Sequence, residues 1–190
     1  MQLSKMLLLG AVMASPLLGQ VLPAQPQRHL DVAVTYDATR SNAAYSNSFW
    51  MQGGSVQLHA QFYHGLGIVA DIAGSHASNI GTGGVGPGLV TATFGPRYTW
   101  TPARSRISLF GQGLIGEANG FDSVFPSPSG VNSSTNGLAL LIGGGVNVTM
   151  TRHLALRGLD ADWLRTELPN GSSNIQNNLR LGAGVVLRFQ

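Results

Sequence analysis

The sequence predicts an all-β fold, an eight-stranded antiparallel up-and-down transmembrane β-barrel. Three observations lead to this fold. Apolar and polar residues alternate along eight segments, the segments follow one another along most of the chain, and the links between them are short and long in turn. A period of two places successive side chains on opposite faces of a strand. Short turns at one rim and long loops at the other are typical of outer-membrane barrels.

The eight predicted strands cover residues 29–39, 52–62, 66–76, 88–100, 105–117, 137–150, 153–166 and 177–190. Tight turns are predicted at 63–65, 101–104 and 150–152, and long polar, Gly-rich or Ser-rich loops at 40–51, 77–87, 118–136 and 167–176. After the N-terminal segment no run reaches 18 apolar residues, so no membrane helix competes with this pattern. The first and last strands are expected to pair, because only a closed sheet leaves no unpaired edge in hydrocarbon.

Alternation alone does not say which face meets water, but three features favour an apolar exterior. The strands have the length that tilted strands need to cross a bilayer. Charged residues fall on the polar face among small residues, which suits a narrow lumen. We therefore predict a lumen charge network of Asp71, Arg97, Asp160, Asp162, Arg180 and Arg188. Aromatic residues near strand ends suit the membrane interfaces, namely Trp50, Phe62, Tyr63, Tyr98, Trp100, Trp163 and Phe189.

Two strands do not alternate cleanly. In the strand predicted over 105–117, Phe110 and Leu114 fall on the polar side. In the strand predicted over 153–166, Arg157 has the opposite parity to Asp160 and Asp162. Either Arg157 reaches the interface from the lipid face, or a β-bulge changes the register. The two carboxylates are expected inside, because a carboxylate in lipid is the costlier arrangement.

Composition excludes several classes of function. Charged residues make up 10% of the chain, against roughly 25% in an average soluble domain. With no Cys there is no disulfide framework, thiol chemistry or Cys-ligated metal site, and no cofactor or metal site is predicted. The formal charge is only +3 and the ten arginines are scattered singly, so nucleic-acid binding is not expected. The GxGxxG pattern at 81–86 is interpreted as a flexible loop, because no helix follows it.

The N-terminal segment resembles a secretory signal peptide. Residues 1–5 carry Lys5, the only lysine, residues 6–18 are apolar, and small residues follow. We predict a signal peptide over 1–24 that is cleaved within 19–27, and an exported barrel domain over 28–190.

The terminal run Leu179–Phe189 alternates strictly and ends in an aromatic residue. It resembles the C-terminal strand by which bacterial outer-membrane proteins are recognised for insertion, although Gln190 follows the aromatic residue. Together with the eight strands, it makes the chain similar to the small OmpA-like, OmpX-like and opacity-type barrels of Gram-negative bacteria. The resemblance implies a non-enzymatic, monomeric outer-membrane protein. It also implies contact with outer-membrane lipids, lipopolysaccharide and the assembly machinery. A narrow pore and an adhesive role for the surface loops are both compatible with the sequence.

Two alternatives remain at this stage. His76-Ala77-Ser78-Asn79 resembles a stretch of outer-membrane lipid A deacylases, which implies His76 as base and Ser78 as nucleophile. This sequence lacks the downstream Glu of that family, and Glu117 is the nearest candidate. The second alternative is a soluble periplasmic ligand-binding barrel, with its apolar face inside.

Overall fold

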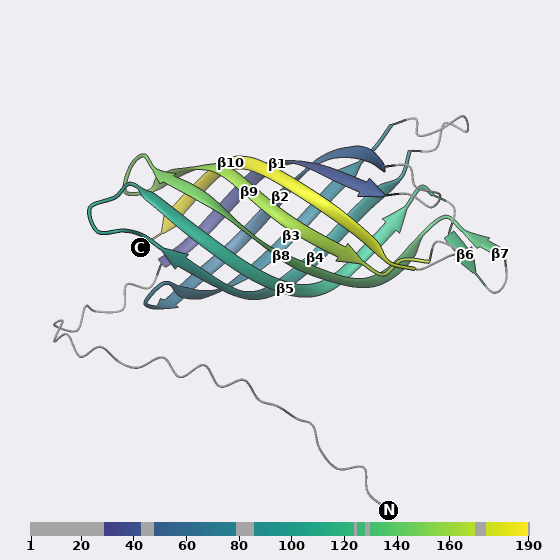
Figure 1. The fold of residues 1–190 in the computed structure, drawn as a ribbon, viewed down its shortest axis with the longest axis horizontal. Coiled ribbons are helices and arrows are strands. Elements are labelled where there is room, and N and C mark those ends of the chain that lie inside the picture. The colour runs from purple at the N-terminus through teal and green to yellow at the C-terminus, as the bar shows by residue number, and fades with distance from the viewer. Residues whose placement is uncertain are drawn as a thin grey trace, which may run out of the picture.

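The computed structural model describes residues 29–42, 48–78, 86–123, 125–127, 130–169 and 174–189. The strands are β1 (His29–Asn42), β2 (Ser48–Tyr63), β3 (Leu66–His76), β4 (Gly88–Trp100), β5 (Ile107–Phe121), β6 (Phe125–Ser127), β7 (Gly130–Asn132), β8 (Thr135–Thr149), β9 (Leu154–Thr166) and β10 (Gln176–Phe189). Within these residues eight strands form one closed barrel (Figure 1), while β6 and β7 pair only with each other. The predicted fold class is confirmed. The predicted signal peptide lies outside the described residues.

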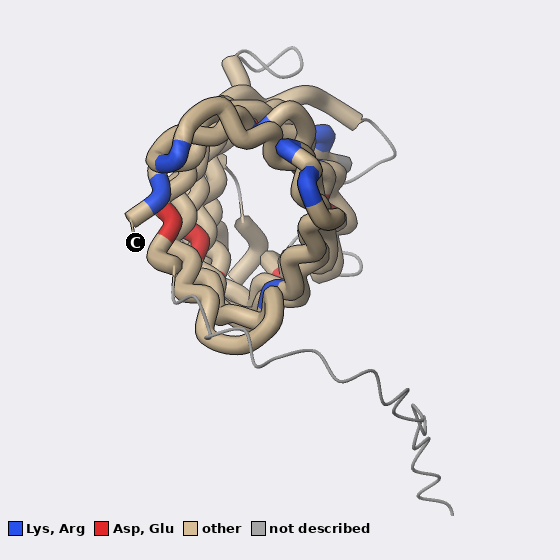
Figure 2. The backbone as a smooth tube through the Cα atoms, turned by 90° about the vertical axis from the view of Figure 1, so that its left-hand side faces the viewer, with Lys and Arg blue, Asp and Glu red and all other residues tan. Residues whose placement is uncertain are grey.

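Closure depends on β1, which pairs antiparallel with both β2 and β10. The barrel order is β1-β10-β9-β8-β5-β4-β3-β2, and every neighbouring pair is antiparallel. Seen along its axis in Figure 2, the backbone makes a complete ring. No barrel strand therefore presents an unpaired edge, which is the condition for placing a sheet in hydrocarbon.

The two ends of the barrel differ in how the strands are joined. At one end, here called the turn end, the links are tight. His64 and Gly65 both have positive φ, 41° and 90°, as a two-residue hairpin turn requires. A Cβ at position 65 would also clash with the backbone oxygen of Thr99, so the turn needs glycine there. The long links meet at the opposite end, here called the loop end.

The turn end gathers positive charge. Arg104, Arg106, Arg152 and Arg188 lie in or beside the tight links and the end of β10, and Figure 2 shows basic positions around this rim. Their spacing along the sequence gave no sign of a basic patch. The fold brings them together because every second link returns to the same rim.

At the loop end five of the barrel strands, β1, β2, β5, β8 and β10, are longer than predicted, and much of the expected 118–136 loop is strand. β5 continues to Phe121, β8 begins at Thr135, and β6 and β7 form a small hairpin between them. Polar side chains hold this extension together: Asn119 donates to Asn136, and Asn136 donates to Glu117 Oε1 at 3.2 Å. The inward positions Ala118 and Gly120 are small and buried, and the outward Asn119 and Asn136 are polar, so the sequence alternation that marks a strand is lost.

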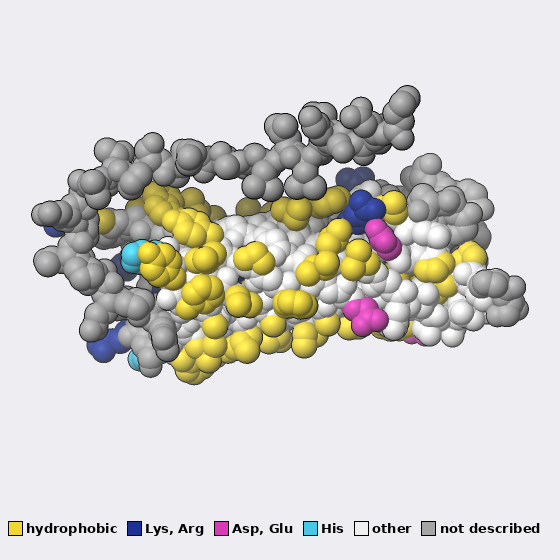
Figure 3. All heavy atoms as spheres, turned by 90° about the horizontal axis from the view of Figure 1, so that it is seen from below, with side chains coloured by type: hydrophobic (Ala, Val, Ile, Leu, Met, Phe, Trp, Pro, Cys, Tyr) yellow, Lys and Arg dark blue, Asp and Glu magenta, His cyan; other side chains and the backbone are white. Residues whose placement is uncertain are grey.

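Many large apolar side chains are exposed on the outer surface of the barrel, as the face seen in Figure 3 shows. Phe94 and Ile72 are each 62% exposed, whereas Arg97 and Arg180 on the opposite face are 3% exposed. None of the described residues forms a helix that is long and apolar enough to cross a membrane.

Candidate functional site in the lumen

The inward faces of the strands meet in a buried ionic arrangement centred on Arg180 of β10. Its Nη1 lies 2.8 Å from Asp71 Oδ2 of β3, and its Nη2 lies 2.8 Å from Asp162 Oδ2 of β9. All three residues are at most 3% exposed. The bond to Asp71 crosses the lumen from β10 to β3, whereas Asp162 lies beside Arg180 on the neighbouring strand.

A second group lies beside this one. Arg157 of β9 contacts Asp160 at 2.9 Å, and Gln57 accepts hydrogen bonds from both Arg97 and Arg157. Arg97 also donates to Gln112. Gln112 Nε2 in turn donates to Asp162 Oδ1 at 3.0 Å, which joins the two groups. We call these eight residues the lumen network: Gln57, Asp71, Arg97, Gln112, Arg157, Asp160, Asp162 and Arg180.

Phe110 of β5 resolves one difficulty of the sequence pattern. Its side chain is buried on the polar side, with the guanidinium carbons of Arg97 and Arg157 at 4.4 and 4.6 Å from the ring centroid. An aromatic face attracts cations, most strongly where water is excluded. Phe110 therefore belongs among the arginines of the lumen network, and the apparent break in alternation does not change the register.

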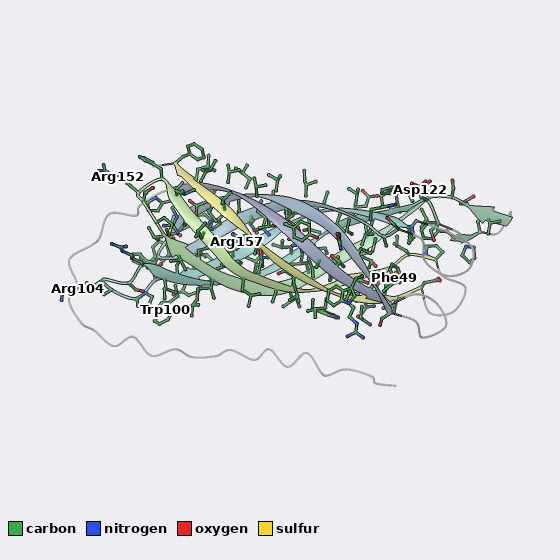
Figure 4. The ribbon with its side chains drawn as sticks, turned by 90° about the horizontal axis from the view of Figure 1, so that it is seen from above. Phe49, Trp100, Arg104, Asp122, Arg152 and Arg157 are labelled. Atoms are coloured by element: carbon green, nitrogen blue, oxygen red, sulfur yellow. The ribbon has the colours of Figure 1, made fainter. Side chains whose placement is uncertain are left out.

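A bulge explains the parity of Arg157. β9 pairs Leu159 with Val146 and then Arg157 with Asn147, so Gly158 has no partner on β8. The extra residue returns Arg157 to the inside, where it is 2% exposed, together with Asp160 and Asp162. Of the two alternatives for this strand, the bulge is the one found. Figure 4 shows Arg157 midway along the barrel, away from the rim marked by Arg152.

Inward glycines leave room for the large polar side chains. A Cβ at Gly143 would clash with Asp162 Oδ1, and a Cβ at Gly182 would clash with Asp37 Oδ1. In a barrel of eight strands the interior is only wide enough for side chains to fill. Glycine at these positions thus provides the volume that the carboxylates occupy.

Asp37 of β1 is a buried carboxylate that the sequence analysis did not single out. It is 3% exposed, and Thr35 donates to its Oδ1 at 2.8 Å. A cavity of about 10 Å³ beside it also touches Arg180, room for roughly one water molecule. Alternation along the first strand places Asp37 on the same face as Thr35 and Thr39, so the signal was present.

The remaining predicted charge, Arg188, does not join the lumen network. It is partly buried near the turn end, where its Nη1 donates to Thr149 Oγ1 at 2.9 Å. Eight residues of β10 separate it from Arg180, although both lie on the polar face of that strand.

Toward the loop end apolar side chains fill part of the lumen, beside the buried polar side chains of Thr39, Ser41, Thr91, Thr166 and Asn178. The prediction of a charged interior did not include this apolar part. We call this the apolar cluster: Met51, Val69, Ala77, Leu89, Leu114, Ala118, Ala139, Leu141, Leu164 and Leu168. Phe49 and Phe125 pack against it from the loop end. The lumen is therefore filled by two different kinds of side chain along its length.

The seven predicted interface aromatics all point outward. They are 42–60% exposed, as Trp50, Phe62, Tyr63, Tyr98, Trp100, Trp163 and Phe189. Most lie near the turn end, as Figure 4 shows for Trp100, and Trp50 and Trp163 lie toward the loop end. This position on the exterior is the one that an interfacial role requires.

The residues of the deacylase alternative do not form a catalytic arrangement in the described part of the chain. His76 and Ser78 are both exposed, and no hydrogen bond joins their side chains. Glu117 pairs with Ala92, which in turn pairs with Ile72, four residues from His76 along β3. The Glu117 carboxylate accepts a hydrogen bond from the side chain of Asn136. Among the described residues, no group of three or more histidine or acidic side chains could hold a metal ion.

Comparison with solved structures identifies the fold. The attachment invasion locus protein Ail of Yersinia pestis superposes with a TM-score of 0.60 at 16% identity, over 85% of this chain and 99% of that one. Neisserial surface protein A superposes with a TM-score of 0.65 at 13% identity, over 84% of this chain and 97% of that one. The outer membrane protein OprG of Pseudomonas aeruginosa superposes with a TM-score of 0.50 at 9% identity, over 87% of this chain and 97% of that one. No family model matches the chain, and no curated protein matches it. The predicted resemblance to small outer-membrane barrels is thereby confirmed for the fold: the chain has the closed eight-stranded architecture of these proteins.

Proposed function

We propose that this chain is a non-enzymatic, integral protein of the bacterial outer membrane, a closed barrel that displays its loops at the cell surface. The observation that carries the proposal is the inversion of polarity across the wall. Leucine, isoleucine and aromatic side chains are exposed outside, while arginines and aspartates are paired inside. Such an exterior is stable against lipid chains, whereas apolar patches of this extent are rare on soluble monomers. A soluble periplasmic barrel would need the opposite arrangement.

The orientation of the barrel in the membrane follows from the difference in link length between its two ends. In barrels of the outer membrane the short turns face the periplasm and the long loops face outside. The turn end, with its arginines, is thus periplasmic, and the β6–β7 hairpin with the other long links is extracellular. We further propose that the signal peptide is removed on export, that the monomer is the working form, and that β10 is the strand read by the assembly machinery.

The lumen supports a barrier role. Arg97, Arg157 and Phe110 pack together inside it, and the apolar cluster and buried polar side chains occupy the part toward the loop end. A wide channel does not fit in a barrel of this size. The protein therefore acts through its surface and its loops rather than by passing solutes, and the lumen network keeps the barrel closed.

Membrane fractionation with heat-modifiable gel mobility is the first test. We expect the protein in the outer-membrane fraction, resistant to salt extraction, with a folded band that shifts only on boiling. The N-terminus of this material should begin within residues 20–28, after signal cleavage. Release by salt alone would favour the soluble class.

Planar-bilayer recording tests the barrier role. The wild-type barrel should show no large, stable channels, and Arg97→Gln and Arg180→Gln should open more often. Arg104→Gln, at an exposed turn, is the matched control and should behave as wild type. Large wild-type channels, or identical traces from all variants, would contradict the proposal.

The non-enzymatic assignment has its own test. Expression of the wild type and of Ser78→Ala should give the same lipid A acylation profile by mass spectrometry. A profile altered by the wild type and restored by Ser78→Ala would instead establish deacylation.

A further inference from the structure

The outer wall of the barrel carries a groove of about 420 Å³ across β4, β5, β8 and β9. This volume falls within the roughly 300–1,000 Å³ of ordinary ligand pockets. Its lining is apolar and includes Phe94, Pro96, Gly113, Ile115, Ile142 and Trp163. A smooth exterior would suffice for contact with lipid, so a recess of this size needs a separate explanation.

Gly113 forms the floor of the groove. It lies on the outward face of β5, and a Cβ there would meet nothing within 4 Å. Large side chains surround it in register: Ile142 pairs with Gly113, Trp163 pairs with Ile142, and Phe94 pairs with Ile115. The groove therefore exists because one residue without a side chain is enclosed by bulky ones.

Charged residues lie at the loop-end margin of this groove. Arg165 pairs with Leu140, which also lines the groove, and it is two residues beyond Trp163 on β9. Two carboxylates lie one step nearer the loops than Arg165, namely Glu167 and, on β5, Glu117. The Oε1 atom of Glu167 is 2.9 Å from Nη2 of Arg165. Charged side chains are sparse on the wall, as Figure 3 shows, and lie at the edge of the apolar belt. The order along the wall is thus apolar, then positive, then negative.

An amphiphile with the complementary order has an acyl chain, then a phosphate, then an ammonium group. Arg165 uses Nη2 for Glu167, and its remaining donors include a terminal nitrogen that can meet a phosphate. Glu117 and Glu167 are both partly or fully exposed and can accept from a primary ammonium. A purely anionic headgroup would also contact Arg165, but its negative charge would be repelled by the carboxylates of Glu117 and Glu167.

We propose that this groove is a lipid-binding site that holds one acyl chain of a lipid whose headgroup carries a phosphate and a primary ammonium, with the phosphate at Arg165 and the ammonium at Glu117 and Glu167. The proposal rests on the membrane-spanning function proposed above and names a specific lipid partner for the wall. It assigns a role to Gly113 and Arg165 that folding alone does not require.

Trp163 provides the probe, because it lines the groove and the chain has three tryptophans. Trp50→Phe with Trp100→Phe leaves Trp163 alone, and Trp50→Phe with Trp163→Phe leaves Trp100 as the reference near the turn end. Each protein is reconstituted into phosphatidylcholine vesicles that contain a minor fraction of lipid brominated on its acyl chains. The brominated lipid is either phosphatidylethanolamine or phosphatidylglycerol, and quenching of tryptophan fluorescence measures its local concentration.

We expect brominated phosphatidylethanolamine to be enriched at Trp163 by about twofold to fivefold over phosphatidylglycerol, the range for one or two exposed ion pairs. Trp100 should show no such preference. In the Trp163-only background, Gly113→Leu should reduce quenching by both lipids because it fills the groove. Gly111→Leu, on the same face of β5 outside the groove, should not. Arg165→Gln and the pair Glu117→Gln with Glu167→Gln should each remove the preference.

Equal quenching by the two lipids, or the same pattern at Trp163 and Trp100, would overturn the inference. So would weak quenching at Trp163 by every lipid together with a cross-linked dimer, since a second copy would then cover the groove. Vesicles made wholly of brominated lipid separate this inference from the proposed function. If neither tryptophan is quenched there, the barrel does not span the bilayer. If both are quenched, only the lipid preference is in question.

Discussion

The two halves of the lumen are filled by different means. In the middle and toward the turn end, the lumen network joins six strands through ion pairs and amide hydrogen bonds, such as Arg180 with Asp71 at 2.8 Å. Toward the loop end, the apolar cluster packs leucines and alanines beside uncharged polar side chains, such as Ser41, which donates to Asn178 Oδ1 at 2.7 Å. Both halves are enclosed by the same wall of alternating strands. The difference shows that the wall constrains which residues point inward, but not whether the interior is held by charge or by packing.

The comparison predicts unequal responses to mutation, and removal of Arg180 should have the largest effect. Arg180→Leu would leave Asp71 and Asp162 buried without their cation. Losing one partner of a buried pair costs about 3–5 kcal/mol, because the remaining charge is uncompensated. The free energy of unfolding, measured by guanidinium titration in lipid vesicles, should fall by this amount.

Arg165→Leu on the outer wall is the matched control for this change. Its partner Glu167 is exposed, so the expected loss is about 0–1 kcal/mol. Combining Arg180→Leu with Asp71→Asn and Asp162→Asn should recover much of the stability. If Arg180→Leu costs no more than Arg165→Leu, the ionic half does not hold the barrel together.

A cavity in the apolar half should have the next largest effect. Leu141 is fully buried in the apolar cluster, so Leu141→Ala should cost about 2–4 kcal/mol through lost burial and an unfilled space. Leu138→Ala on the outward face of the same strand should cost less, because lipid chains can occupy the space. The same titration measures both. An equal loss for the two would mean that the apolar cluster is no better packed than the lipid-facing wall.

These two halves were not equally predictable from sequence. The polar half follows from alternation, because Asp71, Arg97 and Arg180 stand among apolar neighbours of the opposite parity. The apolar half does not. Where Leu140 and Leu141 are adjacent, both faces of β8 are apolar, and nothing in the pattern distinguishes a lipid contact from a lumen contact.

The strand boundaries show the same limit. Strands were predicted correctly within the apolar belt, where one face must meet hydrocarbon and the other must not. Beyond the belt, β5 and β8 continue through Asn119 and Asn136, which bond to each other across the pair. On this extension the buried inward positions are the small residues Ala118 and Gly120, so the sequence shows no alternation of large apolar and polar residues. The bulge at Gly158 is indicated by the sequence, because a single charged residue, Arg157, has the opposite parity to Asp160 and Asp162 in one strand.

The space made by glycine sharpens the comparison further, because the polar half depends on it. Gly143→Ala would place a Cβ against Asp162 Oδ1 and the backbone of β9. Forcing a methyl group into a filled interior costs about 1–3 kcal/mol. Gly113→Ala, outward on the neighbouring strand with open space around it, should change the free energy of unfolding by less than about 1 kcal/mol. Similar values for the two variants would show that the lumen is loosely filled at Asp162.

The smallest expected effect concerns Phe110, where the two modes of packing meet. Its ring lies within 4.6 Å of the guanidinium carbons of both Arg97 and Arg157, and a Cβ at Gly145 would come within 2.8 Å of it. Phe110→Leu keeps an apolar side chain in a confined place but removes the aromatic face. The loss should be about 1–2 kcal/mol, the range for a cation–π contact shielded from water. Phe94→Leu on the outer wall has no such cation and should lose less in the same titration. In planar bilayers Phe110→Leu should also increase the frequency of openings, because the two arginines lose the surface that fixes them. A variant as stable and as silent as wild type would mean that the amide bonds of Gln57 and Gln112 alone hold these arginines in place.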